Sequence, residues 1–289
     1  MNYRHAFHAG NFADVVKHAT LARILVHLRE KAAAFRVIDT HAGAGIYDLA
    51  SEAASRTGEW RDGIGRLAAA ELPPGIAELL APYLAAVAAT NGAGTLDGGA
   101  ALRRYPGSPL IALSLMRSQD RLAACELEPG AAAALAVNLG HDRRAGAVAI
   151  DGWVALNAYV PPKERRGVVL IDPPYEERDE FSRLADRLIA AHRKWATGIF
   201  VLWYPIKDRD GADRLAVTLR RSTIRKLLRV ELAWPPEHAD GRLNGAGLIV
   251  ANPPWRLADE LTQLMPVFER VLATPPGRRS KVDWLAGES

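Results

Sequence analysis

The chain has 289 residues, of which 49% are hydrophobic and 24% are charged, a balance typical of folded globular proteins. This composition excludes a largely disordered chain, and the length predicts two domains or one large domain with an insertion. The 37 Lys and Arg residues exceed the 33 Asp and Glu residues, for a net charge of +4. That charge is compatible with a nucleic-acid partner without requiring one.

Nothing in the sequence predicts membrane attachment or export. No run of about 18 apolar residues is present, and the most apolar long stretch, 76–89, is interrupted by Glu78 and Pro82. The first residues lack the apolar segment of a signal peptide. Cys125 is the single cysteine, which excludes an intramolecular disulfide and favours a reducing compartment. We therefore expect a cytoplasmic protein with no membrane partner, and we expect a monomer.

The pattern of apolar residues predicts an α/β fold. A helix is expected first, because Asn11 is a suitable N-cap and apolar residues follow it at helical spacing as far as Val26. Short apolar runs bounded by turn residues then indicate seven strands. These runs are 35–39, 122–126, 147–151, 168–172, 199–203, 227–232 and 246–251. Helical patterns separate most of them, which predicts a doubly wound, mostly parallel sheet covered on both faces.

An insertion is predicted after the first strand. Residues 65–102 are rich in Ala, Gly and Pro, a composition that predicts short helices joined by flexible turns. The helix expected after the first strand is delayed until Ser108 and Pro109, with Ser108 as its N-cap. We therefore predict a main domain of residues 1–47 and 106–289, interrupted by a helical subdomain of residues 48–105.

The first strand leads into a glycine loop, Asp-Thr-His-Ala-Gly-Ala-Gly at positions 39–45. Glycines at this place let the backbone turn sharply and approach a ligand, which in doubly wound folds is usually a nucleotide cofactor. The third glycine of the dinucleotide motif is missing, which argues against NAD. A plain turn is the alternative interpretation.

Two further strand ends carry acidic residues that suit the same cofactor. Glu126 ends the second strand, where a carboxylate can bind a ribose diol, and Asp151-Gly152 ends the third, where an adenine edge can be bound. The alternatives are an ordinary exposed acid for Glu126 and a simple turn for Asp151-Gly152.

The fourth strand ends in Asp172-Pro173-Pro174-Tyr175. The two prolines fix the backbone and remove two N–H donors, so the motif presents acceptors at Asp172 and at the adjacent carbonyls. An exocyclic amino group of a base needs two such acceptors, and a base pulled out of its stack needs an aromatic face such as Tyr175. We interpret the motif as an amine-holding site.

Together these residues resemble the S-adenosylmethionine-dependent N6-adenine methyltransferases, and more closely the RlmJ family, which methylates an adenine of 23S ribosomal RNA. The segments that carry the resemblance span nearly the whole chain. They are 3–18, 39–45, 105–109, 170–175, 196–199, 202–205 and 252–255. The resemblance implies a Rossmann-like class I methyltransferase with a small helical insertion after strand one, S-adenosyl-L-methionine as cofactor and 23S rRNA as partner.

The resemblance also implies roles for individual residues. Asp172 is implied as the catalytic residue, with Pro173 and Tyr175 beside it, and Tyr3 as a substrate-binding residue near the mouth of the site. Tyr175 is expected to bind the substrate base by stacking. The implied cofactor contacts are His18, His41, Ser108, Glu126, Asp151, Gly152 and Asp172. For His18 the spacing alone leaves a second interpretation, an ion pair with Asp14 across one helical turn.

A second Pro-Pro motif, Asn252-Pro253-Pro254-Trp255, also follows a strand. In methyltransferase-type sheets the seventh strand is antiparallel, which would put this motif at the opposite edge of the sheet. We therefore interpret it as a strand terminator. The densest basic set, Arg220, Arg221, Arg225, Lys226 and Arg229, can track a phosphate backbone or form a solvated face. Five histidines lie within the first 41 residues without cysteines or zinc spacing, so no metal site is expected.

Three rival functions stay open at this point. A DNA adenine methyltransferase shares the chemistry, although no added target-recognition domain is evident. A non-catalytic RNA-binding or assembly factor would not need the residues 172–175. A nicotinamide-dependent oxidoreductase disagrees with the missing third glycine.

Overall fold

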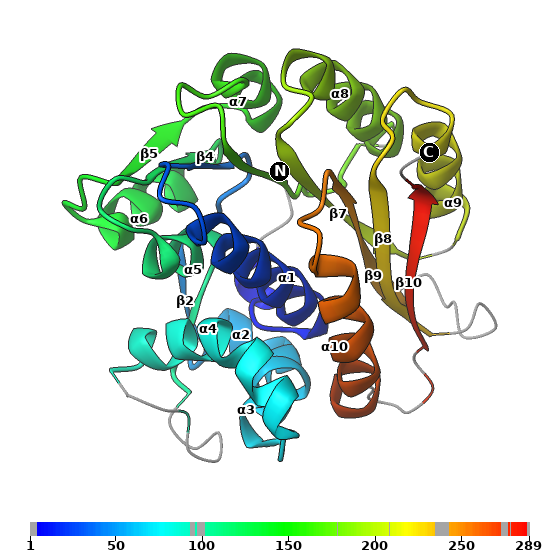
Figure 1. The fold of residues 1–289 in the computed structure, drawn as a ribbon. Coiled ribbons are helices and arrows are strands. Elements are labelled where there is room, and N and C mark those ends of the chain that lie inside the picture. Colours follow the sequence, from blue (N-terminus) through cyan, green and yellow to red (C-terminus); the bar gives the residue numbers. More distant parts are fainter. Residues whose placement is uncertain are drawn as a thin grey trace.

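The computed structural model describes residues 5–92, 96, 102–177, 179–207, 209–234, 243–272, 277 and 279–287. These residues form an eight-stranded sheet, a small two-stranded sheet, and helices that cover the large sheet (Figure 1). In spatial order the large sheet contains β10 (Arg279–Ala286), β8 (Leu227–Ala233), β9 (Gly245–Ala251), β7 (Ile199–Ile206), β6 (Gly167–Ile171), β1 (Arg36–Asp39), β4 (Arg121–Glu126) and β5 (Ala145–Ala149).

The strand directions confirm a doubly wound, mostly parallel sheet. β1 is parallel to β4 and β6, and the β4–β5 and β6–β7 pairs are parallel as well. β9 is antiparallel to both of its neighbours, β7 and β8, so the residues after Ala251 lie at the opposite edge from Asp172, as predicted. The predicted strand number is one too low. β10 pairs antiparallel with β8 alone, and as an edge strand with polar residues it has no continuous apolar run.

Alternate residues of the strands face two separate apolar layers. Val37 and Val168 pack under one layer, where α1 (Phe12–Arg29), α5 (Ser108–Leu115), α6 (Pro129–Leu139) and α10 (Leu257–Leu272) contribute. Ile38 and Val169 pack under the other, against α7 (Gly152–Tyr159), α8 (Glu180–Lys194) and α9 (Arg209–Arg220). This period-two alternation within β1 and β6 explains why both strands read as unbroken apolar runs.

The segment after β1 folds back on itself through the two-stranded sheet. β2 (Ile46–Asp48) pairs antiparallel with β3 (Arg104–Pro106). Between them lie α2 (Glu52–Thr57), the π-helical turn η2 (Arg61–Gly65), α3 (Arg66–Ala69) and α4 (Pro74–Thr90). Buried residues of the insertion and of α1 belong to the same apolar core. The division into a main domain and a subdomain of residues 48–105 therefore stays a proposal.

Two local predictions in this region were wrong, the first only in part. The Ala-rich stretch contains the short helix α3, as predicted, but most of it forms one 17-residue helix, α4, which continues through Pro82. Its buried face of Leu80, Tyr83 and Val87 outweighs the lost backbone hydrogen bond. Ser108 is the first residue of α5, and the N-cap position belongs to Gly107. The residue with an extended backbone is therefore one position earlier than the sequence indicated.

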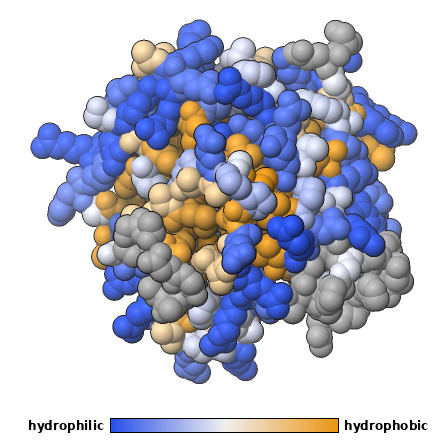
Figure 2. Space-filling view, turned by 60° about the horizontal axis from the view of Figure 1, so that its bottom comes forward, coloured by the Kyte–Doolittle hydropathy of each residue, from blue (hydrophilic) through white to orange (hydrophobic). Residues whose placement is uncertain are grey.

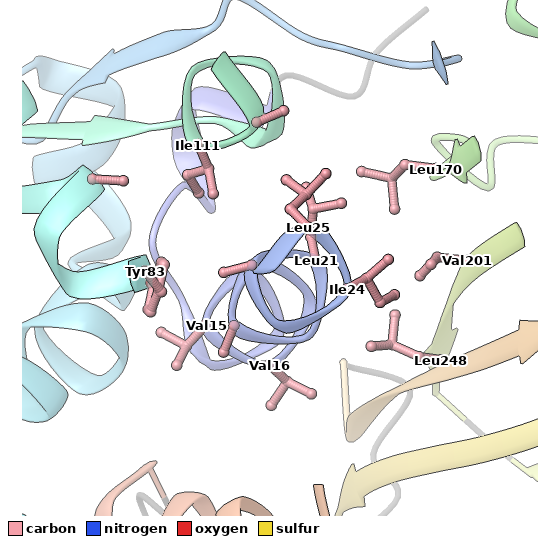
Figure 3. Close-up of a cluster of buried hydrophobic side chains, with 14 of the residues drawn as sticks. Val15, Val16, Leu21, Ile24, Leu25, Tyr83, Ile111, Leu170, Val201 and Leu248 are labelled. Atoms are coloured by element: carbon pink, nitrogen blue, oxygen red, sulfur yellow. The ribbon is translucent and has the colours of Figure 1, made fainter. Parts of the chain in front are cut away.

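Helix α1 is buried on nearly all sides between the sheet and the insertion. Asn11 caps it by accepting hydrogen bonds from the N–H groups of Ala13 and Asp14, as predicted. Ile24 and Leu25 point towards the sheet, while other side chains of α1 point to the insertion and to α5 (Figure 3). A short 3-10 helix, η1 (His5–Phe7), precedes it. Such all-round burial makes α1 the centre of the larger core.

The face at the bottom of Figure 1 carries the insertion. Apolar side chains gather near the middle of this face, with hydrophilic residues around them (Figure 2). Partly buried residues of the insertion, among them Leu72 and Leu79, pack against the main core. Within the described part of the chain, the search for a helix long and apolar enough to cross a membrane found none.

The basic set at 220–229 divides between surface and interior. Arg220, Arg221 and Arg225 are exposed between the end of α9 and the start of β8. Arg229 is buried and donates two hydrogen bonds of 2.8 Å to the carboxylate of Asp283 on β10. Arg229 is therefore a structural residue and not part of a basic surface.

Truncation of α1 at its contact with the sheet tests this packing. Leu25 is fully buried, so Leu25→Ala is expected to lower the free energy of unfolding by about 2–5 kcal/mol. Val137→Ala on α6 is the control, because Val137 is 78% exposed and should change that free energy by about 0.5 kcal/mol or less. Urea unfolding of both variants measures the difference, and equal effects would contradict the described core.

Candidate active site

Acidic residues gather where four neighbouring parallel strands end. β6, β1, β4 and β5 lie side by side. Asp172 follows β6, Asp39 and Glu126 are the last residues of β1 and β4, and Asp151 lies just after β5. The predicted adjacency of the glycine loop and the Asp172 motif is confirmed by the parallel pairing of β1 with β6.

A cavity of about 650 Å³ opens at this edge of the sheet. Its volume lies within the range of cofactor and substrate sites. It brings together most of the residues singled out in the sequence. Those that line it are His41, Glu126, Asp151, Gly152, Asp172 and Pro173. Others among its lining residues are His5, Tyr47, Trp153, Glu180 and Arg183.

Four predicted site residues are not among the described residues that line this cavity. His18, Ser108 and Tyr175 are in the described part of the chain but do not line the cavity. Tyr3 lies outside the described residues. The predicted roles of these four, like those of the lining residues, stay proposals.

The glycine loop and Glu126 fix each other. Gly43 has a φ of +61°, which residues with a side chain rarely adopt, and its N–H donates to Oε2 of Glu126 at 2.8 Å. Oε1 of Glu126 accepts from the N–H of Glu128 at 2.8 Å. Both carboxylate oxygens are therefore oriented by the backbone at the wall of the cavity.

Gly152 allows the β5–α7 turn to approach β1 closely. A Cβ atom at Gly152 would lie 2.4 Å from the carbonyl oxygen of Thr40 and 2.6 Å from the ring of His41. Asp151 caps α7 through Oδ1, which accepts from the N–H groups of Trp153 and Val154 at 2.9 Å. This cap fixes the Asp151 carboxylate at the cavity wall. Burial lowers the pKa of His41 to about 4, so its ring is neutral at physiological pH.

Asp172 is held by an ion pair that the sequence did not reveal. Oδ2 of Asp172 accepts a hydrogen bond of 2.5 Å from the ammonium of Lys17 on α1. The same ammonium lies 2.9 Å from Oδ1 of Asp14. Oδ2 of Asp14 in turn accepts from the N–H of Gly10 at 2.9 Å and contacts Nε2 of His5 at 3.0 Å. A continuous polar chain thus runs from η1 through α1 to the Asp172 motif.

The charges in this chain stabilise one another. Burial alone would lower the pKa of Lys17, but Asp14 and Asp172 raise it well above its usual range. Burial alone would raise the pKa of Asp14, but Lys17, His5 and His18 lower it well below its usual range. Lys17 and Asp14 are therefore both charged at neutral pH, although each side chain is at most 5% exposed.

His18 is buried, and its side chain contacts other residues of the protein interior. Its Nδ1 lies 2.7 Å from the hydroxyl of Tyr105, with the two rings stacked, and that hydroxyl lies 3.0 Å from the hydroxyl of Tyr83. The expected pairing with Asp14 across one turn is present only at 4.0 Å. Burial lowers the pKa of His18 to about 3, so a neutral ring links α1 to the insertion.

Asp39 is a buried acid whose hydrogen bonds are incomplete. It is 2% exposed, and its Oδ1 has no hydrogen-bond partner among the described residues. Burial raises the pKa of Asp39 to about 7, against the lowering effect of a hydrogen bond from Ser108. A buried acceptor without a donor is costly, and a bound cationic or N–H group would satisfy it.

Tyr175 has an unusual backbone and a fixed ring. Its φ is +54°, a left-handed conformation that is uncommon outside glycine. Its hydroxyl donates to the carbonyl of Trp203 at 2.7 Å, and its ring packs against those of Trp203 and Phe181. The strained turn places the ring directly beyond Asp172.

Three residues at the site were not predicted as functional. They are Lys17, Asp39 and Glu180. The Asp14–Lys17 spacing of one helical turn was visible, but the partner of Lys17 lies 155 residues further along the chain. Glu180 lines the cavity with a buried Oε1 that has no hydrogen-bond partner among the described residues and lies 3.9 Å from the guanidinium of Arg183, and burial raises its pKa.

The described residues contain no group of three or more His, Cys, Asp or Glu side chains arranged to hold a metal ion. His5 and His18 use a ring nitrogen in the contacts with Asp14 and Tyr105 given above, and Nδ1 of His41 lies 2.8 Å from the hydroxyl of Thr40.

The raised pKa of Asp39 makes stability depend on pH. The folded-state pKa of about 7 exceeds the unfolded value of 3.8, so the folded protein loses stability from this group as pH rises from about 4 to 7. Asp39→Asn removes that loss. The difference in melting temperature, variant minus parent protein without ligand, is therefore expected to increase as the pH is raised from 5 to 8.

The control is Asp142→Asn, whose parent carboxylate has a lowered pKa because Arg144 bonds to it. Asp142 is ionised throughout that pH range, so the relative melting temperature of this variant should not rise. A constant offset for Asp39→Asn over the same range would show that Asp39 does not titrate as described.

Comparison with known proteins agrees with this geometry. The family model described as "Ribosomal RNA large subunit methyltransferase D, RlmJ" matches residues 32–286. A protein named ribosomal RNA large subunit methyltransferase J from Haemophilus influenzae is 39% identical, and one of the same name from Escherichia coli is 40% identical, each alignment covering 100% of both chains.

A solved structure supports the fold over the same length. Protein LPL1258 from Legionella pneumophila superposes with a TM-score of 0.85 and 32% identity, covering 96% of this chain and 98% of that one. Sheet order, cavity and relatives lead to one conclusion: the chain belongs to the RlmJ family of ribosomal RNA large subunit methyltransferases.

Proposed function

We propose that the protein transfers a methyl group from S-adenosyl-L-methionine to N6 of an adenine in 23S ribosomal RNA. The observation that carries the proposal is the position of Asp172, a carboxylate held by Lys17 at the wall of a cavity with further acids at the neighbouring strand ends. The relatives' names supply the ribosomal substrate. We further propose that the protein acts in the cytoplasm as a monomer without a metal.

The cavity residues fit the cofactor by chemistry. Glu126 offers an oriented carboxylate for the ribose hydroxyls, and Asp151 and Gly152 lie at the next strand end for the adenine edge. Asp39 has an unsatisfied buried oxygen that suits a donor such as an ammonium group. His18 and Ser108 do not line the cavity and would act through Tyr105 and Asp39.

Asp172 and Pro173 would act by orienting the amino group. One oxygen of Asp172 is occupied by Lys17, which leaves Oδ1 to accept one N6 hydrogen while the Pro173 carbonyl accepts the other. These bonds draw the nitrogen lone pair out of the ring system and direct it for in-line attack. When bound, the cofactor supplies the electrophilic methyl group.

The methylated nitrogen is cationic and readily loses one of its two protons, so no strong base is needed before transfer. Tyr175 would stack on the flipped base and Tyr3 would approach from the substrate side. Stacking of this kind contributes about 1–3 kcal/mol per base.

Methyl transfer from labelled S-adenosylmethionine tests the proposal. Unmodified 23S rRNA and unmethylated duplex DNA are supplied in parallel, and the labelled nucleoside is identified. We expect N6-methyladenine in the RNA only. Asp172→Ala removes an acceptor and the local charge, so turnover should fall on the order of 10²-fold or more, with cofactor binding mostly kept.

The other outcomes separate the rival functions. Label in the DNA would keep the mechanism and overturn the substrate. Label in neither, with the cofactor shown to bind, would favour a ribosomal precursor as substrate or a non-catalytic RNA-binding factor. Near-normal turnover of Asp172→Ala would refute the role of that residue.

A further inference from the structure

The edge of the sheet opposite the active site presents a tryptophan to solvent. Trp255 is 70% exposed, although large aromatic side chains are usually at least partly covered. The guanidinium of Arg256 lies over its ring, 4.4 Å from the ring centre. One face of the indole is therefore covered by a cation, and the high exposure leaves the rest of the ring open.

The segment that carries Trp255 is rigidly held. Asn252 has a φ of +52°, and its side-chain amide donates to the carbonyls of Ala196 and Gly198 at 2.8 Å. Its backbone N–H donates to the carbonyl of Lys226 at 2.9 Å. Pro254 is buried and accepts from the first residue of α10. These bonds fix the backbone on either side of Trp255 before any partner binds, which lowers the entropy cost of binding.

The bonds of Asn252 reach the turn after α8 and Lys226 before β8, two segments that carry basic residues. We define the basic edge by Arg193 at the end of α8, Arg220, Arg221, Arg225 and Lys226 before β8, and Trp255 and Arg256 before α10. All but Lys226 are classed as exposed. Arg193, Arg220, Arg221 and Arg225 have no ion-pair partner among the described residues. Arg256 lies 3.9 Å from the carboxylate of Glu30.

We infer that the basic edge is a second RNA-binding surface, where an unpaired base stacks on Trp255 and the arginines contact neighbouring phosphates. An aromatic face flanked by exposed arginines is the arrangement by which proteins bind single-stranded nucleic acid. The inference rests on the proposed ribosomal RNA substrate and deepens it. A flanking segment of the rRNA would bind at this edge while the target adenine lies at the other.

Binding of a labelled short oligoadenylate, measured by fluorescence polarisation, tests the inference. Trp255→Ala should weaken binding about fivefold or more, while Trp255→Phe should retain most of the affinity. The control is Val137→Ala, because Val137 is 78% exposed on α6, a helix that packs on β4 and β5 and lies outside the basic edge, so the change should not alter the affinity. Unchanged affinity of Trp255→Ala would overturn the inference.

The charge contribution is tested through salt. The triple variant Arg220→Gln, Arg221→Gln, Arg225→Gln should flatten the slope of log affinity against log salt by about 2, because each lost phosphate contact on a single strand contributes about 0.7. An unchanged slope would show that these arginines do not contact RNA phosphates.

Methyl transfer to intact 23S rRNA separates this inference from the proposed function. If the parent protein methylates no RNA but Trp255→Ala still weakens RNA binding, the proposed function fails and the surface stands. If the variants bind RNA normally and lose transfer only on protein-containing ribosomal particles, the edge contacts a protein and the inference is overturned.

Discussion

The buried pairing of Lys17 with Asp14 and Asp172 is the interaction on which the rest of the structure depends. One ammonium is shared by a carboxylate of its own helix and one that lies 155 residues later. Removing one partner of such a buried set leaves an uncompensated charge, which costs several kcal/mol. The helix that carries Lys17 must therefore be held firmly, and α1 is packed against the sheet, the insertion and α10 for most of its length.

A second, neutral contact anchors the same helix to the insertion. His18 follows Lys17 in the sequence, and its ring bonds to Tyr105, which bonds to Tyr83 on α4. Burial keeps His18 uncharged, so it adds no competing cation beside Lys17. The charged contact orients the residue at the site, and the neutral one fixes the helix behind it. In this way an insertion remote from the cavity supports the position of Asp172.

The parts predicted from the sequence are those whose signal is local. Because β6 is buried on both faces, its sequence is a continuous apolar run. Both the strand and the motif that follows it could therefore be predicted. β10 pairs on one side only and shows no such run. α4 is stabilised by its buried face, which cannot be predicted from an Ala-rich sequence that contains Pro82. The Lys17–Asp172 contact could not be predicted, because it depends on how distant segments pack. Glu180 and Asp39 each have a buried oxygen without a hydrogen bond, a feature that becomes visible only in the folded structure.

A double-mutant comparison tests most directly whether Lys17 and Asp172 act as one unit. Single-turnover methyl transfer would be measured for Lys17→Met, Asp172→Asn and the double variant, with the exposed Lys163→Met as control. If Lys17 serves to position Asp172, Lys17→Met should slow transfer about 10²-fold, and the double variant should be no slower than the slower single variant. Losses that multiply, or a Lys17→Met rate near that of the parent protein, would contradict the account.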